Sequence, residues 1–265
     1  MIRSCCNMSR LTRLPSVAYA VFIYSFLYVP IAILVAYSFN DSKLNAVWKG
    51  FTFAWYAKLW TNTSILEAAK ISLTVGFFST VISTMLGTLV AVGMYRYRFR
   101  GKGMIDAMLY VPLVMSEIVM GIALLAFFSM IKVPLGMGTL LIAHITFSIP
   151  FVVVVINARL KGFDQSIEEA SKDLGANEWQ TFRLITFPLL GPAIAASAML
   201  AFTISIDDVI VSFFVAGPDS TTLPLQIFSM VRHGVTPEIN ALSTLMLIVT
   251  LTFVVFAQKL QTRKR

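Results

Sequence analysis

Residues 166–188 read SIEEASKDLGANEWQTFRLITFP, a polar insert between two long apolar runs. The spacing of Ser166 and Glu169 is that of a capping box, which predicts that a helix begins here. Gly175 can adopt the left-handed conformation that ends a helix. The first half of the insert therefore predicts a short helix that ends at a glycine. Its apolar residues recur on one face at helical spacing: Ile167, Ala170 and Leu174.

The second half of the insert predicts another short helix. Asn177 and Gln180 repeat the cap signal, and Pro188 is expected to end the segment. Two helices that face water and yet carry apolar residues are better explained by a docking partner than by solvent alone. The apolar side of the second helix is formed by Trp179, Phe182 and Ile185.

This insert resembles the EAA loop of ABC importer permeases. The match consists of Glu169-Ala170-Ser171, Gly175, Ile185 and Pro188 in register. Ser171 and Phe187 depart from the usual alanine and leucine, and both changes in size are modest. The alternative is an ordinary cytoplasmic helical hairpin. The resemblance implies docking in a groove of an ATPase subunit through Glu169, Ala170, Ser171, Asp173, Leu174, Gly175, Ala176, Phe182, Ile185 and Pro188.

The composition indicates an integral membrane protein. The 265 residues are 57% hydrophobic and 13% charged, with a mean hydropathy of +0.80. A soluble domain of this size would need more polar residues to cover its surface. The net charge of +8 is spread over the ends of apolar runs, so no nucleic-acid partner is expected. The adjacent Cys5 and Cys6 and the distant His144 and His233 suggest neither a disulfide framework nor a metal site.

Six apolar runs are long enough to cross a bilayer as helices, each of which needs roughly 20 residues. The predicted fold class is an all-α polytopic membrane protein with six transmembrane helices. The first run is too long for a signal peptide and lacks a convincing cleavage site. The spans are placed at about 17–39, 67–94, 104–131, 138–158, 189–216 and 240–260.

The domain organisation follows from these spans. We expect an N-terminal cytoplasmic segment at 1–16, a transmembrane domain at 17–260 with a cytoplasmic loop at about 159–188, and a cytoplasmic tail at 261–265. Lysine and arginine concentrate at both termini, near residue 100 and in the 159–188 loop, and the positive-inside rule places these segments in the cytoplasm.

Two outer segments are singled out by their composition. The loop at about 40–66 contains Trp48, Trp55, Tyr56 and Trp60. Such residues suit the membrane interface, and a contact with a binding protein is the other interpretation. The segment 217–239 carries glycine and proline at both ends, and residues 225–231 between them predict a short helix.

Acidic residues within the predicted spans are candidate functional groups. Glu117 lies about 13 residues into the third span, roughly 20 Å along it. Asp207 and Asp208 lie in the fifth span. A charge at this depth costs roughly 2.5–3.5 kcal/mol and normally faces protein or a water-filled cavity. No basic side chain lies centrally in any predicted span, and His144 is only a weak candidate partner.

The acids therefore predict a path for a cation that supplies the missing charge. Hydrogen bonding to the backbone or to Ser205 and Ser212 is the alternative. Adjacent helical residues point about 100° apart, so Asp207 and Asp208 are not both expected to face one narrow pore. We assign Asp207 to the pore and Asp208 to helix packing or the outer mouth.

The wider sequence resembles permeases of spermidine/putrescine importers. The matching segments are YRYRFRGK at 95–102, HITFSIPFVVV at 144–154, ARLKGFD at 158–164, SIDDVIVSFFVAGP at 205–218 and PEINALSTL at 237–245. The family usually has an aspartate after proline where this chain has Ser116-Glu117. The resemblance implies a type I ABC importer permease fold and a polyamine path along Glu117 and Asp207. Asp208 is a further candidate for the path, and Tyr110, Phe147 and Phe213 are candidate cation–π contacts.

The resemblance also implies the partners and location. These are a second homologous permease (a heterodimer), an ATP-binding subunit dimer that holds ATP and Mg, and a periplasmic polyamine-binding protein, in the bacterial inner membrane. This chain has no G-x-x-x-x-G-K-[ST] phosphate loop and is expected to be a non-catalytic transport subunit without a cofactor. The main alternative is a proton-coupled secondary transporter of small cations. A membrane hydrolase lacks its motifs, and a purely structural subunit would have no translocation path.

Overall fold

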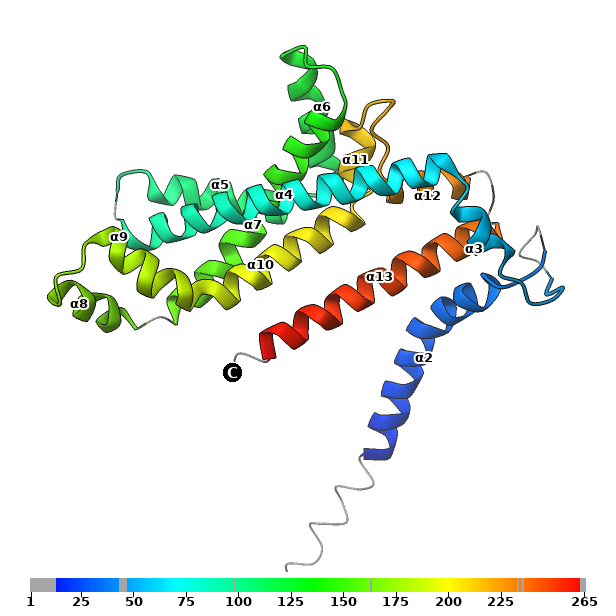
Figure 1. Ribbon diagram of the computed structural model, residues 1–265, viewed down its shortest axis with the longest axis horizontal. Helices are drawn as coiled ribbons and strands as arrows, with labels where there is room; N and C mark the ends of the chain where they lie inside the picture. The colour runs from blue at the N-terminus through cyan, green and yellow to red at the C-terminus, as the bar shows by residue number, and fades with distance from the viewer. Residues whose placement is uncertain are drawn as a thin grey trace, which may run out of the picture. The chain divides into compact units, whose positions relative to one another are not determined.

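The computed structural model describes residues 13–42, 47–97, 99–162, 164–232, 234 and 236–262, and within these ranges every regular element is a helix (Figure 1). The chain divides into two compact units. One comprises Met1–Thr61 and Met230–Leu247, and the other comprises Asn62–Ser229 and Ile248–Arg265. The predicted segments 1–16 and 261–265 lie largely outside the described residues.

The first unit contains α2 (Arg13–Tyr37), α3 (Ala54–Leu59) and the start of α13 (Pro237–Thr262). Its connecting loop is held by aromatic rings, since Phe39 stacks on Phe51 at 5.0 Å and packs against Phe53 and Tyr56. Lys58 on α3 forms an ion pair with Glu238 on α13 at 2.6 Å. The described part of the predicted aromatic segment is thus folded and includes α3.

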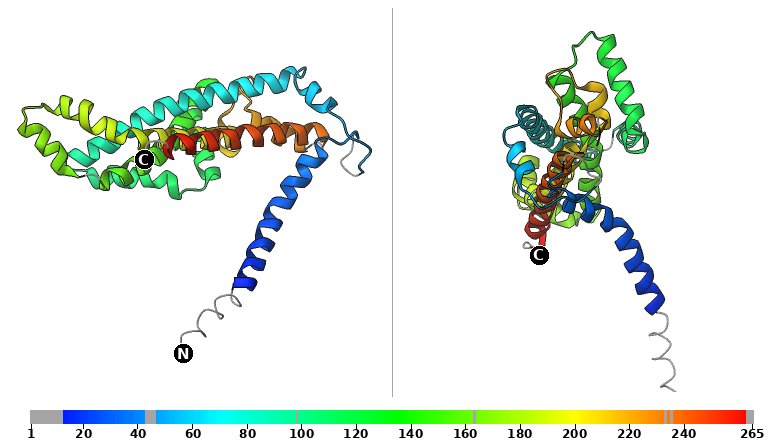
Figure 2. Two further views of the ribbon diagram at one scale, coloured as in Figure 1. Left: turned by 60° about the horizontal axis from the view of Figure 1, so that its bottom comes forward. Right: turned by 90° about the vertical axis from the view of Figure 1, so that its right-hand side faces the viewer.

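The second unit has a core of three long helices: α4 (Thr63–Arg96), α7 (Met137–Lys161) and α10 (Phe187–Asp207). They lie side by side in Figure 1 and in Figure 2. Small residues allow this approach, because a Cβ at Gly87 would lie 2.6 Å from the side chain of Val152. The buried cluster between them comprises Ala91, Val92, Val152, Val153, Ile156, Leu160, Leu190 and Ala201.

Two predicted spans are interrupted in the structure. The predicted span 104–131 is two helices, α5 (Lys102–Val114) and α6 (Glu117–Met130), and the chain bends by 114° between them. The expectation of one continuous helix is wrong because Met115 and Ser116 adopt extended backbone conformations, with ψ of 143° and 138°.

The predicted span 189–216 is likewise broken. Helix α10 ends at Asp207, Asp208 is extended with ψ of 125°, and α11 (Ile210–Val215) is a separate short helix. Helix α6 packs closely on α11, because a Cβ at Gly121 would lie 2.4 Å from the ring of Phe214. The two breaks therefore lie near one another in the second unit.

The described helices account for most of the predicted spans. Four are long and apolar enough to cross a membrane: Tyr19–Tyr37 of α2, α4, α7 and the continuous run Glu178–Asp207. The bent pair α5 and α6 would be a fifth, and the apolar part of α13 is the shorter segment Pro237–Thr252. The short helix predicted at 225–231 is confirmed as α12 (Leu223–Arg232).

The contact between α6 and α11 generates the first prediction. Gly121→Ala should lower the melting temperature of the purified protein, because the new methyl group overlaps Phe214 and overpacking costs about 1–3 kcal/mol. Thermal unfolding followed by intrinsic fluorescence measures the change. Gly93→Ala in α4 is the matched control, since no atom lies within 4 Å of its added Cβ. Equal melting temperatures for the two variants would contradict the prediction.

Candidate functional site

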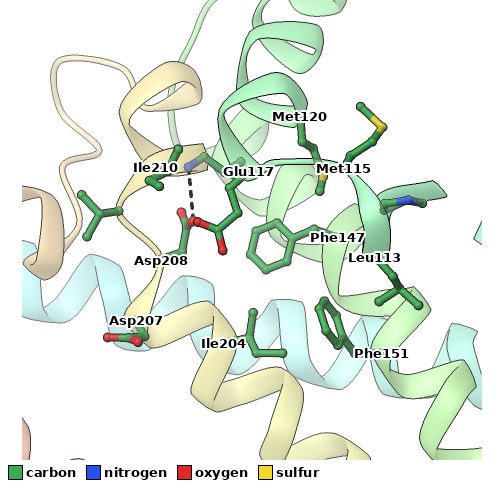
Figure 3. Close-up of a pocket in the computed structure, with 13 residues that line it drawn as sticks. Leu113, Met115, Glu117, Met120, Phe147, Phe151, Ile204, Asp207, Asp208 and Ile210 are labelled. Carbon is green, nitrogen blue, oxygen red and sulfur yellow. Dashed lines mark hydrogen bonds between the residues drawn. The ribbon is translucent and has the colours of Figure 1, made fainter. Parts of the chain in front are cut away.

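A cavity of about 430 Å³ opens at the two helix breaks (Figure 3). It is bounded by α5, α6, α7, α10 and α11. Three acidic residues line it: Glu117, Asp207 and Asp208. The remaining lining residues are apolar: Pro112, Leu113, Met115, Met120, Phe147, Phe151, Ile204, Val209, Ile210 and Val211.

The acids occupy helix ends rather than the interior of continuous spans. Glu117 is the first residue of α6, Asp207 is the last of α10, and Asp208 links α10 to α11. Both adjacent acids are among the lining residues, but in Figure 3 the side chain of Asp208 points toward Glu117, whereas that of Asp207 points away from it. Glu117 and Asp207 are exposed, whereas the side chain of Asp208 is only 6% exposed.

Asp208 is fixed by hydrogen bonds from α11. Its Oδ1 accepts from the backbone N–H of Val211 at 3.2 Å. Its Oδ2 accepts from both the backbone N–H and the hydroxyl of Ser212, each at 2.7 Å. The alternative that a hydroxyl satisfies this acid is thus confirmed for Ser212. The carboxylate stabilises the free N–H groups that begin α11.

His144 lies behind Asp208 and is completely buried. Its Nδ1 is 2.7 Å from the hydroxyl of Ser205, and its Nε2 is 3.1 Å from the hydroxyl of Ser212. The same Nε2 is 3.6 Å from Asp208 Oδ2. Sequence reasoning treated His144 as a weak partner. Its position three residues before the buried Phe147 on an apolar helix face was the available signal.

The three predicted cation–π candidates separate into two groups. Phe147 lines the cavity, together with Phe151, which was not predicted. Tyr110 and Phe213 are 50% and 51% exposed and are not among the lining residues.

The cavity has an acidic charge balance. Among the described residues that line it, none is basic, three are acidic, and the remainder are apolar. Such a cavity attracts cations, because low-dielectric walls strengthen the field of the carboxylates. No group of three or more His, Cys, Asp or Glu side chains in the described ranges is placed to hold a metal ion.

The first helix of the insert at 166–188 is α8 (Gln165–Asp173). Its N-cap is Asp164, whose side chain accepts from the backbone N–H of Ser166 at 3.0 Å. The predicted cap at Ser166 is therefore wrong by two residues. Hydrogen bonds from Ser166 lower the pKa of Asp164. Gly175 has a φ of +86°, as the predicted glycine bend requires.

The second helix continues into the membrane-spanning region. Asn177 and Gln180 form the predicted capping box at the start of α9 (Glu178–Thr181). A π-helical turn, η1 (Phe182–Thr186), then leads directly into α10. Pro188 does not end the segment, because it lies in the first turn of α10, where the π turn accommodates its missing N–H. We call α8, α9 and η1 the hairpin.

The hairpin exposes a strongly apolar surface. Leu174 is 90% exposed, and Trp179 and Leu184 are 66% and 69% exposed. Ser171 is instead buried and bonds the hydroxyl of Thr181 at 2.9 Å, which ties α8 to α9. Of the predicted docking residues, Glu169, Ala170, Asp173, Leu174, Gly175 and Pro188 are exposed, Ala176, Phe182 and Ile185 are half-buried, and Ser171 is buried.

An ion-pair junction joins the hairpin to α4. Arg96 at the end of α4 lies 2.8 Å from Glu168, and its guanidinium also donates to the hydroxyl of Thr186 at 2.9 Å. Glu178 approaches the other terminal nitrogen of Arg96 at 3.3 Å. The side chains of Arg96 and Glu168 are each only 12% exposed. Sequence reasoning missed this junction, since its partners are far apart in the chain.

A second basic side chain supports the junction. Lys172 forms an ion pair with Glu178, and its hydrogen bond lowers the pKa of that carboxyl. Both residues are exposed, so this pair adds little stability on its own.

The fold is that of ABC importer permeases. The fold matches a bacterial ABC transporter that imports alginate, with a TM-score of 0.76, 17% identity and coverage of 98% of this chain and 99% of that one. It also matches an amino acid ABC transporter, with a TM-score of 0.61, 16% identity and coverage of 81% and 100%.

The chain belongs to the family of binding-protein-dependent transport system inner membrane components, which matches residues 83–264. It is a non-catalytic, multi-pass permease component of the inner membrane, and in this family the ATPase is a separate subunit.

Curated relatives match most of the chain. Identity is 50% over 236 residues, 89% of both chains, with the spermidine/putrescine transport system permease protein PotC of Escherichia coli (strain K12). It is 47% over 247 residues, 93% of this chain and 96% of the other, with PotC of Haemophilus influenzae. It is 44% over 231 residues, 84% and 82%, with the putrescine transport system permease protein PotI of Escherichia coli (strain K12).

The Arg96 junction generates the second prediction. Arg96→Met should accelerate amide hydrogen exchange in residues 165–181 by at least about tenfold, because breaking a largely buried ion pair leaves Glu168 without its charge partner. Exchange followed by mass spectrometry measures it. Arg100→Met, which removes an exposed charge nearby, is the control. Unchanged exchange in Arg96→Met would show that the junction does not hold the hairpin.

Proposed function

We propose that this chain is a permease subunit of an ATP-driven importer of polyamines, spermidine or putrescine, and lines part of the translocation path. The acidic cavity at the two helix breaks is the observation that carries the proposal. Polyamines are flexible chains of methylene groups with ammonium groups along them. A cavity with carboxylates on an apolar wall fits both parts of such a molecule. The names of the relatives support the same substrate class.

Within the cavity, the carboxylates have different roles. Glu117 and Asp207 are exposed and free to approach ammonium groups, whereas Asp208 is held by the start of α11. Phe147 and Phe151 offer their rings to the methylene groups, and a ring face also attracts a cation. Asp207 remains our candidate for the primary contact in the path.

The hairpin is proposed to couple ATP hydrolysis to transport. Its exposed Leu174 and Trp179 would dock in the ATPase subunit. From Glu178 to Asp207 the chain is one helical run of 30 residues, roughly 45 Å long. Movement of the hairpin would therefore displace Asp207 as part of a rigid body. The Arg96 junction would carry the same movement to α4.

The assembly follows the same proposal. A second homologous permease, different from this one, would complete the pathway, and an ATPase dimer would hold ATP and Mg. A periplasmic polyamine-binding protein would deliver the substrate, with the loop 40–66 and the segment 217–239 on its side of the membrane. Both termini and the hairpin would face the cytoplasm, and residues 17–260 would form the transmembrane domain.

Uptake by the purified complex tests the function. Proteoliposomes with both permeases, the ATPase and loaded binding protein should accumulate radiolabelled spermidine or putrescine only when ATP is present inside. A proton ionophore should leave this uptake unchanged. Uptake that collapses with the proton gradient while ATP is maintained would instead support a proton-coupled secondary transporter.

Asp207→Asn generates the third prediction. Removing this charge should lower polyamine uptake by about tenfold, since hydrogen bonds and contacts to charged groups contribute about 1.5–3 kcal/mol each. Initial uptake rates per assembled complex measure the loss. Glu67→Gln, an exposed acid at the start of α4, is the matched control. Wild-type rates for Asp207→Asn would remove this residue from the pathway.

Leu174→Asp generates the fourth prediction. The side chain is almost fully exposed, so the variant should fold normally and yet weaken docking of the ATPase. Co-purification of the ATPase and uptake should both fall by about tenfold, because a buried interface does not accept an unpaired charge. A leucine inside a predicted span, such as Leu73, is not a suitable control, because an aspartate there would disturb the membrane. The control is Thr63→Asp, which places the same charge at an exposed position at the start of α4. Normal ATPase binding by Leu174→Asp would contradict the docking role.

A further inference from the structure

We infer that His144 is a positioning residue of the cavity, which holds Asp208 in place through a directed chain of hydrogen bonds. The chain runs from Ser79 through Ser205, His144 and Ser212 to the Asp208 carboxylate. Its role in transport rests on the proposed function, whereas the hydrogen-bonding state of His144 does not.

The direction of the chain follows from counting protons. An ionised Asp208 only accepts, and the hydroxyl of Ser212 donates its single proton to Oδ2 at 2.7 Å. Towards His144 this hydroxyl must therefore accept, so Nε2 of the imidazole carries a proton and donates to it at 3.1 Å. The proton on Nε2 is thus dictated by the charge on Asp208.

The other side of the ring completes the chain. Burial disfavours a charged imidazole, and a neutral ring with a proton on Nε2 has none on Nδ1. Nδ1 therefore accepts from the hydroxyl of Ser205 at 2.7 Å. The oxygen of Ser205 is then available to accept from Ser79, whose hydroxyl lies 3.1 Å from it and 3.3 Å from the carbonyl oxygen of Gly76, the other acceptor for the same proton.

The chain links four helices at the break between α10 and α11. Ser79 lies on α4, His144 on α7, Ser205 on α10 and Ser212 on α11. In Figure 3 the side chains of Asp208 and Glu117 point toward one another across the cavity. His144 thereby sets the position of a hydrogen-bonded carboxylate opposite an exposed one. If His144 had no proton on Nε2, no donor on α7 would hold the hydroxyl of Ser212, which in turn donates to the Asp208 carboxylate.

The tautomer of His144 provides a direct test. Nitrogen-15 NMR of the assembled complex, with labelled histidine, should show a neutral imidazole protonated on Nε2. The signals are assigned to His144 by their loss in His144→Gln. A proton on Nδ1 alone, or on both nitrogens, would overturn the chain as described. This result does not depend on which substrate the complex transports.

Uptake rates of two variants test the positioning role. In His144→Gln the amide N–H can replace the Nε2 donor, so uptake per assembled complex should stay within about threefold of wild type. In His144→Phe a ring remains but no donor does, and uptake at saturating loaded binding protein should fall about tenfold. Thr146→Val, an exposed position on the same helix, is the control.

The uptake rates per assembled complex distinguish a positioning role of His144 from a merely structural one. A merely structural role would lower the amount of assembled complex for both His144 variants and leave the rate per complex unchanged, which would overturn the proposal. If His144→Phe does not assemble, Ser212→Ala removes the same link and should lower the rate in the same way. Absence of polyamine uptake by the wild-type complex would reject the proposed function instead, and would leave the tautomer result standing.

Discussion

The structure depends on how an apolar helical protein satisfies the polar groups exposed when a helix stops. Where α10 ends and α11 begins, the backbone N–H groups of Val211 and Ser212 need acceptors that the surrounding apolar side chains do not offer. Asp208 supplies them. The same hydrogen bonds stabilise the carboxylate, so that one residue allows both a helix break and a charge beside the cavity. The acidic cavity is therefore a consequence of the interrupted helices.

A second constraint is continuity between the hairpin and the cavity. The run from Glu178 to Asp207 has no interruption, and Arg96 ties the hairpin to α4 as well. Two helices of the core thus share one attachment at the hairpin. The hairpin lies at one end of α10 and the break at Asp208 lies at the other, which is the arrangement that the proposed coupling would use.

The periodicity and caps of the sequence predicted the helical class, the hairpin, its glycine bend and α12. They did not predict the breaks, because apolar residues continue on both sides of Ser116-Glu117 and of Asp207-Asp208. Proline did not help either, since Pro150 lies within the unbroken α7. The acidic residues were identified by the free-energy cost of placing a charged group in an apolar segment. The junction at Arg96 and the contacts of His144 with Ser205 and Ser212 join segments that are distant in the chain, which a single sequence does not reveal.

The π turn at η1 has a consequence for the spacing between the hairpin and the acids. A π turn contains about one residue more than an α turn. Deleting one residue from Phe182–Thr186 would therefore let the backbone return to regular α geometry, and Asp207 would still face nearly the same way relative to the hairpin. Deleting one residue from the regular α-helix of the same run would instead rotate Asp207 by about 100° and shift it by about 1.5 Å relative to the hairpin. The π turn is thus the place in this run where the chain takes up a change of length without turning the acids away from their direction.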